Sequence, residues 1–175
     1  TLDAPTATAM VDNTLTFQVR AQSVTDDPRS DNNLGFTSTF LSPPVSDLVV
    51  QVLDAPFILK GKDVLRIRLS NLGRDPARNV RVSFQASNGG TKLAPVAPAG
   101  WTCGSVALLA GSYRTECELA GDFADGSQQE FELRLASGRS NLVVLTAGAS
   151  TSTYDVNAFN NFDSRVYMVL VRRTQ

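Results

Sequence analysis

Four stretches of the chain alternate apolar and polar residues with a period of two. Their polar positions carry Arg, Glu, Gln, Ser and Thr, and the stretches are residues 15–21, 65–69, 80–86 and 131–135. This alternation is typical of a β-strand that buries one face and exposes the other to water. A further stretch, residues 142–145, is wholly aliphatic and has the length of a strand. The pattern therefore predicts an all-β protein.

Turn-forming residues separate the predicted strands. They occur at Pro43-Pro44, Gly61, Asn71-Leu72-Gly73, Asn88-Gly89-Gly90, Gly121-Asp122 and Asp125-Gly126. Helical patterns are nearly absent. The best candidate, residues 106–110, is bounded by Gly104 and Gly111, and its length suits a short strand or a single turn better than a stable helix. Short strands joined by polar turns predict an antiparallel β-sandwich.

The two ends of the chain resemble each other. Residues 15–27 end in Asp27 and are followed by Asn32-Asn33, and residues 143–155 end in Asp155 and are followed by Asn160-Asn161. The offset is the same throughout, 155 − 27 = 128 and 160 − 32 = 128. A period of this length is typical of tandem globular modules, and the alternative is a chance likeness of two hairpins.

The repeat predicts the domain organisation. We expect one complete module at residues 46–175, preceded at residues 1–45 by the closing strand pair of a truncated repeat. A two-stranded hairpin is marginally stable in water. Residues 1–45 are therefore expected to dock on the complete module, with pairing to another chain or poor order as the alternatives.

Composition excludes several kinds of chemistry. The 175 residues include no His, which removes a Ser-His-Asp triad, an imidazole base and His-based zinc sites. A net charge of -1 argues against nucleic acid as a partner. No apolar run approaches the roughly 18 residues of a membrane span. Ser-Lys or Schiff-base chemistry has three candidate lysines, none in a recognisable motif. Chemistry by paired carboxylates, drawn from 17 acidic residues, is not excluded. We predict that the chain is not an enzyme, with no catalytic residues and no cofactor.

The two cysteines, Cys103 and Cys117, are predicted to form a structural disulfide. Cys103 shares a strand face with Trp101, Cys117 shares one with Thr115, and neighbouring strands can bring the two sulfurs into bonding range. A pair of cysteines without a metal-binding motif favours a disulfide formed in an oxidising compartment. A redox pair is the alternative, but the spacing is not CxxC. Trp101 is interpreted as a core residue that packs near the disulfide. Its alternative role, as a platform for binding glycans, lacks the usual strip of aromatic residues.

Four motifs in order resemble a known family. They are Asp47-Leu48-Val49-Val50, then Leu69–Gly73 with Ala77–Val82, then Gly100–Cys103 with Cys117, and last Asp155 with Asn160-Asn161. Together they resemble the bacterial surface conserved-repeat domain (domain of unknown function eleven) and, more loosely, the cell-adhesion-related domain found in bacteria. The resemblance implies an immunoglobulin-like β-sandwich of about seven to nine strands, arrayed in tandem on the bacterial surface and without catalytic residues.

Two loops rich in Asp and Asn are candidate calcium sites. Calcium binds carboxylate, amide and carbonyl oxygens. One candidate set is Asp155, Asn157, Asn160 and Asp163, and the second is Asp27, Asp31 and Asn33. The alternative is that these residues shape the turns, because Asp and Asn side chains bond nearby backbone amides and tolerate left-handed geometry. The loops lack the Gly and the bidentate Glu of an EF-hand.

These observations predict an extracellular or cell-surface module, with the periplasm as an alternative location. Since the sequence begins with Thr1 and shows no signal peptide, we expect a mature chain or an excised fragment. The predicted role is that of a spacer or protein-interaction domain, whose partners are neighbouring repeats or another surface protein. The alternatives are a calcium-stiffened adhesin module, a carbohydrate-binding accessory domain of a secreted enzyme, and a carboxylate-based hydrolase.

Overall fold

The computed structural model describes residues 6–11, 14–53, 57–59, 64–87, 91–137 and 141–170. The chain divides into two compact units, Thr1–Pro43 and Pro44–Gln175. We call the first the N-terminal unit and the second the C-terminal module. The division follows Pro43, whereas the sequence placed the boundary after residue 45. The turns expected at Gly61 and Asn88-Gly89-Gly90 lie outside the described residues.

The N-terminal unit is a three-stranded antiparallel sheet. Its strands are β1 (Thr6–Val11), β2 (Thr14–Arg20) and β3 (Leu34–Phe40), and the 3-10 turn η1 (Ser30–Asn32) precedes β3. Strands β2 and β3 correspond to the strand pair that the sequence predicts. Strand β1 is additional. Its sequence, Thr-Ala-Thr-Ala-Met-Val, alternates Thr with the small residue Ala and then ends in two consecutive apolar residues, so its period-two signal is weak.

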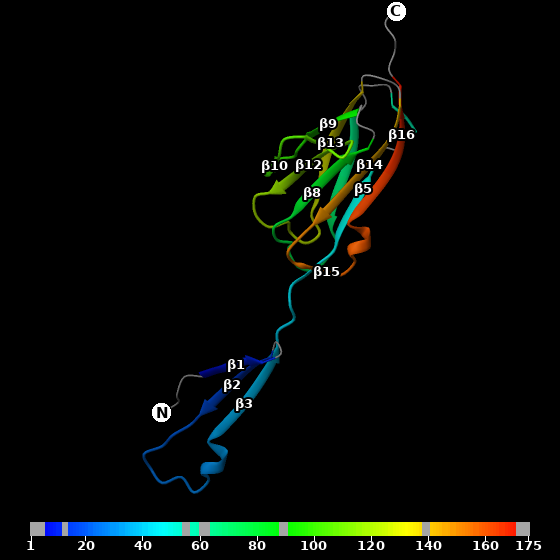
Figure 1. Ribbon diagram of the computed structural model, residues 1–175. Coiled ribbons are helices and arrows are strands. Elements are labelled where there is room, and N and C mark those ends of the chain that lie inside the picture. Colours follow the sequence, from blue (N-terminus) through cyan, green and yellow to red (C-terminus); the bar gives the residue numbers. More distant parts are fainter. Residues whose placement is uncertain are drawn as a thin grey trace, which may run out of the picture. The chain divides into compact units, whose positions relative to one another are not determined.

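The C-terminal module is an antiparallel β-sandwich, which confirms the predicted fold class (Figure 1). One sheet has the order β5-β7-β13-β9, and the other has the order β10-β12-β8-β14-β16-β6 with β11 also paired to β12. Two pairings of two residues each are parallel, β15 with β4 and β16 with β6, and the sequence did not predict them. The elements are β4 (Val45–Ser46), β5 (Leu48–Val52), β6 (Ile58–Leu59), β7 (Val64–Asn71), β8 (Arg81–Ala86), β9 (Thr91–Val96), β10 (Trp101–Cys103), β11 (Ala107–Leu109), β12 (Ser112–Leu119), β13 (Gln128–Ser137), β14 (Asn141–Ser150), β15 (Tyr154–Asp155), the 3-10 turn η2 (Ala158–Asn160) and β16 (Phe162–Val169).

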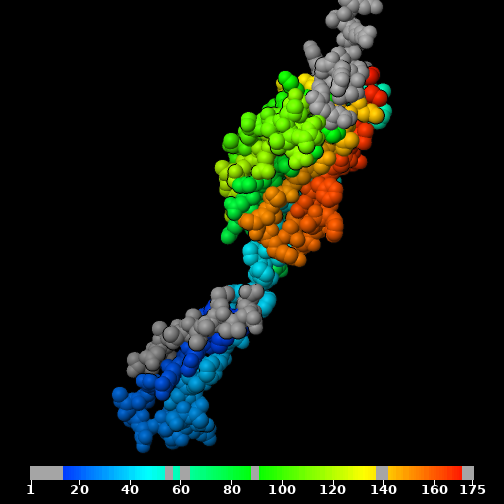
Figure 2. Space-filling model, in the orientation of Figure 1, coloured from blue at the N-terminus to red at the C-terminus, as the bar shows by residue number. Residues whose placement is uncertain are grey.

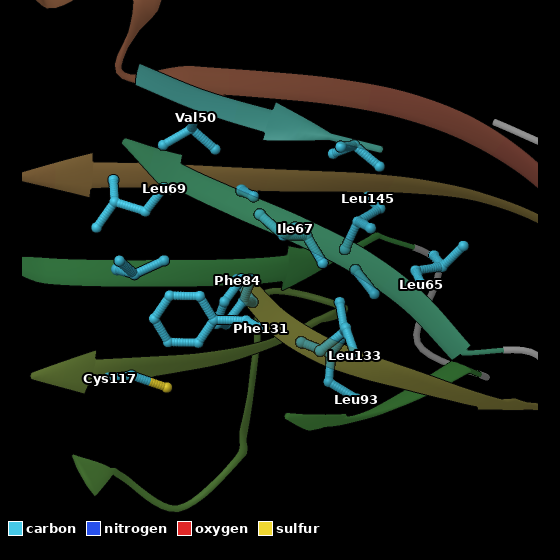
Figure 3. Packing of buried hydrophobic residues seen from close by; sticks show 14 of the residues in the cluster. Val50, Leu65, Ile67, Leu69, Phe84, Leu93, Cys117, Phe131, Leu133 and Leu145 are labelled. Atoms are coloured by element: carbon cyan, nitrogen blue, oxygen red, sulfur yellow. The ribbon is translucent and has the colours of Figure 1, made fainter. Parts of the chain in front are cut away.

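The core lies between the two sheets and consists of the apolar positions of the alternating strands (Figure 3). On β7, for example, Leu65, Ile67 and Leu69 are fully buried, while the arginines between them point away from the core. Three aromatic rings, those of Phe84, Phe131 and Trp101, pack edge to face near the centre. Trp101 is only 8% exposed, in agreement with its predicted core role.

Strands β10, β11 and β12 form the edge of the larger sheet and hold the disulfide. Residues 106–110, the best helix candidate, form β11 and a tight turn through Ala110 and Gly111, both of which have positive φ. Cys103 on β10 lies opposite Cys117 on β12, and the two are bonded, as the sequence predicts. The buried face of β12 carries Thr115 and Cys117.

Helical structure is limited to η1 and η2 in the part of the chain that the structure describes. None of the helices found there has the length and apolar character needed to span a membrane.

Removing the disulfide is expected to destabilise the C-terminal module. In the chain-entropy model, a loop closed over a separation of 14 residues contributes roughly 3 kcal/mol to the free energy of unfolding. The double variant Cys103→Ala/Cys117→Ala should therefore unfold at a lower urea concentration than the oxidised wild type. Reducing agent should lower the midpoint of the wild type and leave that of the variant unchanged. Equal midpoints for oxidised and fully reduced wild type would contradict a stabilising role.

Candidate functional site

The chain enters the C-terminal module through a short segment, Val45–Leu48, that we call the leading segment. Its residues Val45 and Ser46 form β4 and pair in parallel with Tyr154 and Asp155 of β15. The backbone N–H of Val156 also donates to the carbonyl of Ser46 at 3.0 Å. Ser46 is fully buried, although it is polar and lies at the edge of the sandwich. The module therefore encloses its own first residues.

On one side, the leading segment is held by residues 151–163, which we call the Asp/Asn loop. One carboxylate oxygen of Asp155 (Oδ2) accepts the backbone N–H of Leu48 at 2.9 Å, and the other (Oδ1) accepts the N–H of Asn157 at 2.9 Å. The side-chain amide of Asn160 donates to Asp47 Oδ1 at 2.9 Å. In the space-filling view, this orange loop gathers at the end of the module where the cyan leading segment arrives (Figure 2).

On the other side, the leading segment is held by Asn71 at the end of β7. This side chain is fully buried. Its oxygen accepts the backbone N–H groups of Asp47 (3.2 Å) and Gly73 (3.1 Å). Its amide donates to the carbonyls of Asp75 (3.0 Å), Phe123 (3.2 Å) and Ala124 (3.3 Å). Asn71 thus joins the leading segment to two turns that are distant in the sequence.

Gly73 is in contact with the leading segment through its backbone. A Cβ at this position would lie 2.5 Å from Ser46 Cα and 2.6 Å from the Asp47 nitrogen. Any side chain would therefore displace the leading segment. The sequence identifies Asn71-Leu72-Gly73 as a turn and as part of a family motif, but not as this clamp. Turn chemistry and a buried clamp require the same residue types, so the sequence contains no signal that separates them.

The predicted calcium ligands of the C-terminal module lie near one another but serve different contacts. Asp163 Oδ2 accepts the N–H of Val52 at 2.9 Å and the guanidinium of Arg165 at 3.1 Å. Asn157 is exposed at the start of η2 and makes no side-chain cap. Among the described residues, no three His, Cys, Asp or Glu side chains group together as a metal site. Calcium binding stays a prediction.

Two amide oxygens of the Asp/Asn loop are buried without a hydrogen-bond donor among the described residues. They are Oδ1 of Asn160 and Oδ1 of Asn161. Each amide nitrogen is occupied, because Asn160 donates to Asp47 and Asn161 donates to Asp155 Oδ2 at 3.2 Å. Buried polar atoms of native proteins are usually paired with protein, water or an ion. A water molecule or a cation at this loop would satisfy these two oxygens.

The second predicted loop, in the N-terminal unit, repeats the geometry of the first at an offset of 128 residues. The turns η1 and η2 span Ser30–Asn32 and Ala158–Asn160, and their flanking residues Asn33 and Asn161 have φ of -80° and -75°. Equivalent hydrogen bonds have equal lengths: Ala21 N to Asn33 O and Ala149 N to Asn161 O are both 2.8 Å. The N–H groups of Arg29 and Asn157 donate to Asp27 and Asp155, both at 2.9 Å.

In the second set, Asp27 and Asn33 interact with each other within their own loop. The backbone N–H of Arg29 and the side chain of Asn33 hold the pKa of the Asp27 carboxyl below its ordinary value. Asp31 is exposed, and Asn33 is half-buried. Gly35 stands where the module has Asp163, so the N-terminal unit lacks the contact that Asp163 makes with β5.

The Asp/Asn loop itself carries exposed apolar side chains. Phe159 is 89% exposed, and Tyr154, Val156 and Phe162 are also exposed. In the N-terminal unit, Asp31, Asp26 and Pro28 stand at the positions of Phe159, Tyr154 and Val156, and only Leu34, at the position of Phe162, is a large exposed apolar residue. Large exposed aromatic side chains of this kind are enriched at protein interfaces.

Comparisons with known proteins support the fold. No family model matches the sequence, and no curated protein matches it. A CARDB domain from Pyrococcus furiosus, solved in complex with di-metal ions, matches with a TM-score of 0.51 and 11% identity over 75% of this chain and 95% of that chain. A cohesin module from a Clostridium perfringens family 33 glycoside hydrolase matches with a TM-score of 0.48 and 15% identity over 74% and 99%. AvmM, which catalyses macrocyclization in alchivemycin A biosynthesis, matches with a TM-score of 0.49 and 14% identity over 75% and 93%.

The CARDB match is to the cell-adhesion-related class that the sequence resembles, and it confirms the immunoglobulin-like sandwich. At 11% identity it shows the fold alone. The closer resemblance, to the conserved-repeat family, is not confirmed by these comparisons.

Replacing Gly73 by Ala should destabilise the C-terminal module. The new methyl group would overlap the backbone of Ser46 and Asp47, and overpacking of this kind costs about 1–3 kcal/mol. Gly104→Ala is a matched control, because a Cβ there meets only the Glu116 carbonyl at 3.6 Å. Urea unfolding of both variants measures the difference. If Gly73→Ala and Gly104→Ala had the same midpoint, the proposed close contact would be wrong.

Proposed function

We propose that the chain is part of a bacterial secreted or surface protein, in which the C-terminal module acts as a non-catalytic spacer. The carrying observation is that the polypeptide enters this module at the end where β15 lies and leaves it beyond β16 at the opposite end (Figure 1). A module connected in this way transmits tension along its length. The clamp formed by Asn71 and Asp155 lies where that tension would first act on the fold.

The direction of the terminal strands supports a mechanical role. The leading segment pairs in parallel with β15, and β6 pairs in parallel with β16. When two parallel strands are pulled from opposite ends, the load acts along both strands. Their hydrogen bonds are then stretched together rather than one after another. The side-chain bonds from Asp155 and Asn71 to the backbone of the leading segment add to this resistance.

Several further features support an extracellular location and an absence of catalysis. The disulfide suits an oxidising compartment. The sequence has no histidine, and Trp101 is buried in the core, where its ring is not available as a sugar platform. The exposed aromatic residues around the Asp/Asn loop favour a protein partner, which we propose to be a neighbouring repeat or another surface protein.

Single-molecule extension tests the spacer role. With the full chain tethered through its two termini, the C-terminal module should unfold in one cooperative step. Asp155→Ala should lower the most frequent unfolding force, because it removes the acceptor of the Leu48 N–H. Asp125→Ala, at an exposed turn of the same module, is the matched control and should leave the force unchanged. Stepwise unfolding, or equal forces for the two variants, would refute the proposal.

A second candidate function is a module stiffened by a divalent cation such as calcium at Asp155 and its neighbours. The unpartnered oxygens of Asn160 and Asn161 favour it. The CARDB domain of similar fold, which was solved in complex with di-metal ions, adds support.

Thermal melting of the full chain tests calcium binding. A cation that binds only the folded state contributes about 2.7 kcal/mol when its concentration is a hundred times its Kd. Calcium should then raise the melting temperature, and EDTA should reverse the change. Asn160→Ala should abolish the response, while Asp125→Ala should retain it. An unchanged melting temperature in calcium would exclude this candidate.

A further inference from the structure

The loop of the N-terminal unit has the same backbone as the Asp/Asn loop, but the Asp/Asn loop also holds another part of its module. In the C-terminal module, Thr151 and Thr153 hold the segment Pro76–Arg78. The Arg78 N–H donates to Thr153 Oγ1 at 3.0 Å, Thr151 Oγ1 donates to the Arg78 carbonyl at 2.8 Å, and Thr153 Oγ1 donates to the Pro76 carbonyl at 3.3 Å. Asp155 also accepts the N–H of Leu48 in the leading segment, so the loop is hydrogen-bonded to two other stretches of the module.

In the N-terminal unit, the equivalent groups bond to one another. Ser23 and Thr25 replace the two threonines, and their hydroxyl groups lie 3.0 Å apart in a mutual hydrogen bond. Asp27 is bonded within its own loop. No strand equivalent to β4 lies beside the loop among the residues described in this unit. The loop instead borders an open hollow of about 920 Å³, whose lining includes Arg20, Ser23, Thr25, Asp27 and Asn33.

The apolar face of β2 shows the same difference. Leu15, Phe17 and Val19 correspond to Val143, Leu145 and Ala147 of β14, which are all fully buried against the opposite sheet. In the N-terminal unit, Val19 is 38% exposed, and Leu15 and Phe17 are half-buried. The hairpin therefore carries a core-facing surface without an opposite sheet in the described part of its unit.

Strand β1 occupies a position that belongs to another strand in the complete module. It pairs antiparallel with β2 on the edge that corresponds to the edge of β14 where β8 pairs. The other edge of β2 pairs with β3, and the other edge of β14 pairs with β16 in the same register. β1 stands directly before β2 in the chain, as β13 stands directly before β14. In the complete module, however, β13 belongs to the sheet opposite β14, whereas β1 pairs with β2 in the same sheet.

From these four observations we infer that residues 14–40 form the closing hairpin of a second immunoglobulin-like module and bind the body of that module. The partner is a polypeptide of the same kind as residues 44–140. Its leading segment offers a backbone N–H to Asp27, and its turn offers the backbone of a Pro76–Arg78 equivalent to Ser23 and Thr25. In the bound state, its strand equivalent to β8 takes the place of β1.

A chimera of the chain tests this inference, which rests on the proposed role as a modular spacer. Residues 1–12 are replaced by a copy of residues 44–140, so that residue 140 of the copy precedes Asn13 as it precedes Asn141 in the natural module. The calorimetric enthalpy of unfolding should rise by about half relative to the natural chain, since it scales with the number of folded residues and the chimera has 260 residues against 175. Amide hydrogen exchange in residues 14–40 should slow by about tenfold or more.

Matched variants identify the contacts. In the chimera, Asp27→Ala should lower the melting temperature of the added module by roughly 5 °C. Asp26→Ala should not, because Asp26 corresponds to the exposed Tyr154. A second chimera carries Phe17→Leu, Val19→Ala and Thr39→Tyr, which place the natural module's core residues at these three positions. It controls for a failure to fold that is caused only by poorly fitting side chains.

Two outcomes would overturn the inference. One is that both chimeras unfold with the enthalpy of the natural chain and with residues 14–40 no better protected. The other is that Asp26→Ala and Asp27→Ala have equal effects. The change in enthalpy relative to the natural chain and the hydrogen exchange of residues 14–40 report folding of the added module, so they leave the extension result for the C-terminal module unaffected. A failure of the spacer role and a failure of this inference are therefore distinguishable.

Discussion

The C-terminal module depends on the capture of its first residues by side chains. The leading segment forms a ladder of only two residues with β15, which is too short to hold an edge in place by itself. Asn71 and Asp155 supply the missing bonds, each by accepting a backbone N–H of the segment. Because Asn71 also binds the turn at Phe123 and Ala124, the same side chain fixes the ends of both sheets relative to the incoming chain. A buried, fully bonded amide of this kind orders a region that hydrophobic packing alone would leave free to shift.

The two hairpins show how much of this arrangement is local. Asp27 and Asp155 accept equivalent backbone N–H groups at the same distance, although one hairpin lies in a three-stranded sheet and the other in a full sandwich. The loop geometry is therefore encoded within about thirty residues, through Asx-type bonds that need no partner from the rest of the chain. The two copies differ in what the hydroxyl groups of the loop bind. In the C-terminal module, Thr151 and Thr153 bond to the segment Pro76–Arg78. In the N-terminal unit, Ser23 and Thr25 bond to each other.

The sequence predicted the parts of the fold that depend on local pattern. The alternation in Leu65–Leu69 and Phe131–Leu135 identified core strands correctly, and the facing positions of Cys103 and Cys117 identified the disulfide. Strands β6 and β15 were missed, since two-residue strands pair through backbone groups that leave no trace in side-chain order. The clamp at Asn71 was missed for a related reason. Besides the nearby Gly73 and Asp75, its partners lie 24 and more than 50 residues away, and no local pattern records which distant carbonyl a buried amide will meet.

The disulfide between β10 and β12 has a consequence for the reach of an extended chain. It ties together two residues separated by 14 positions, so the β11 hairpin between them cannot straighten while the bond is intact. At about 3.5 Å per residue, an oxidised module that has been pulled open spans roughly 45 Å less than a reduced one. The redox state of the surroundings would thus set the maximum length of the unfolded protein, independently of the force at which it unfolds.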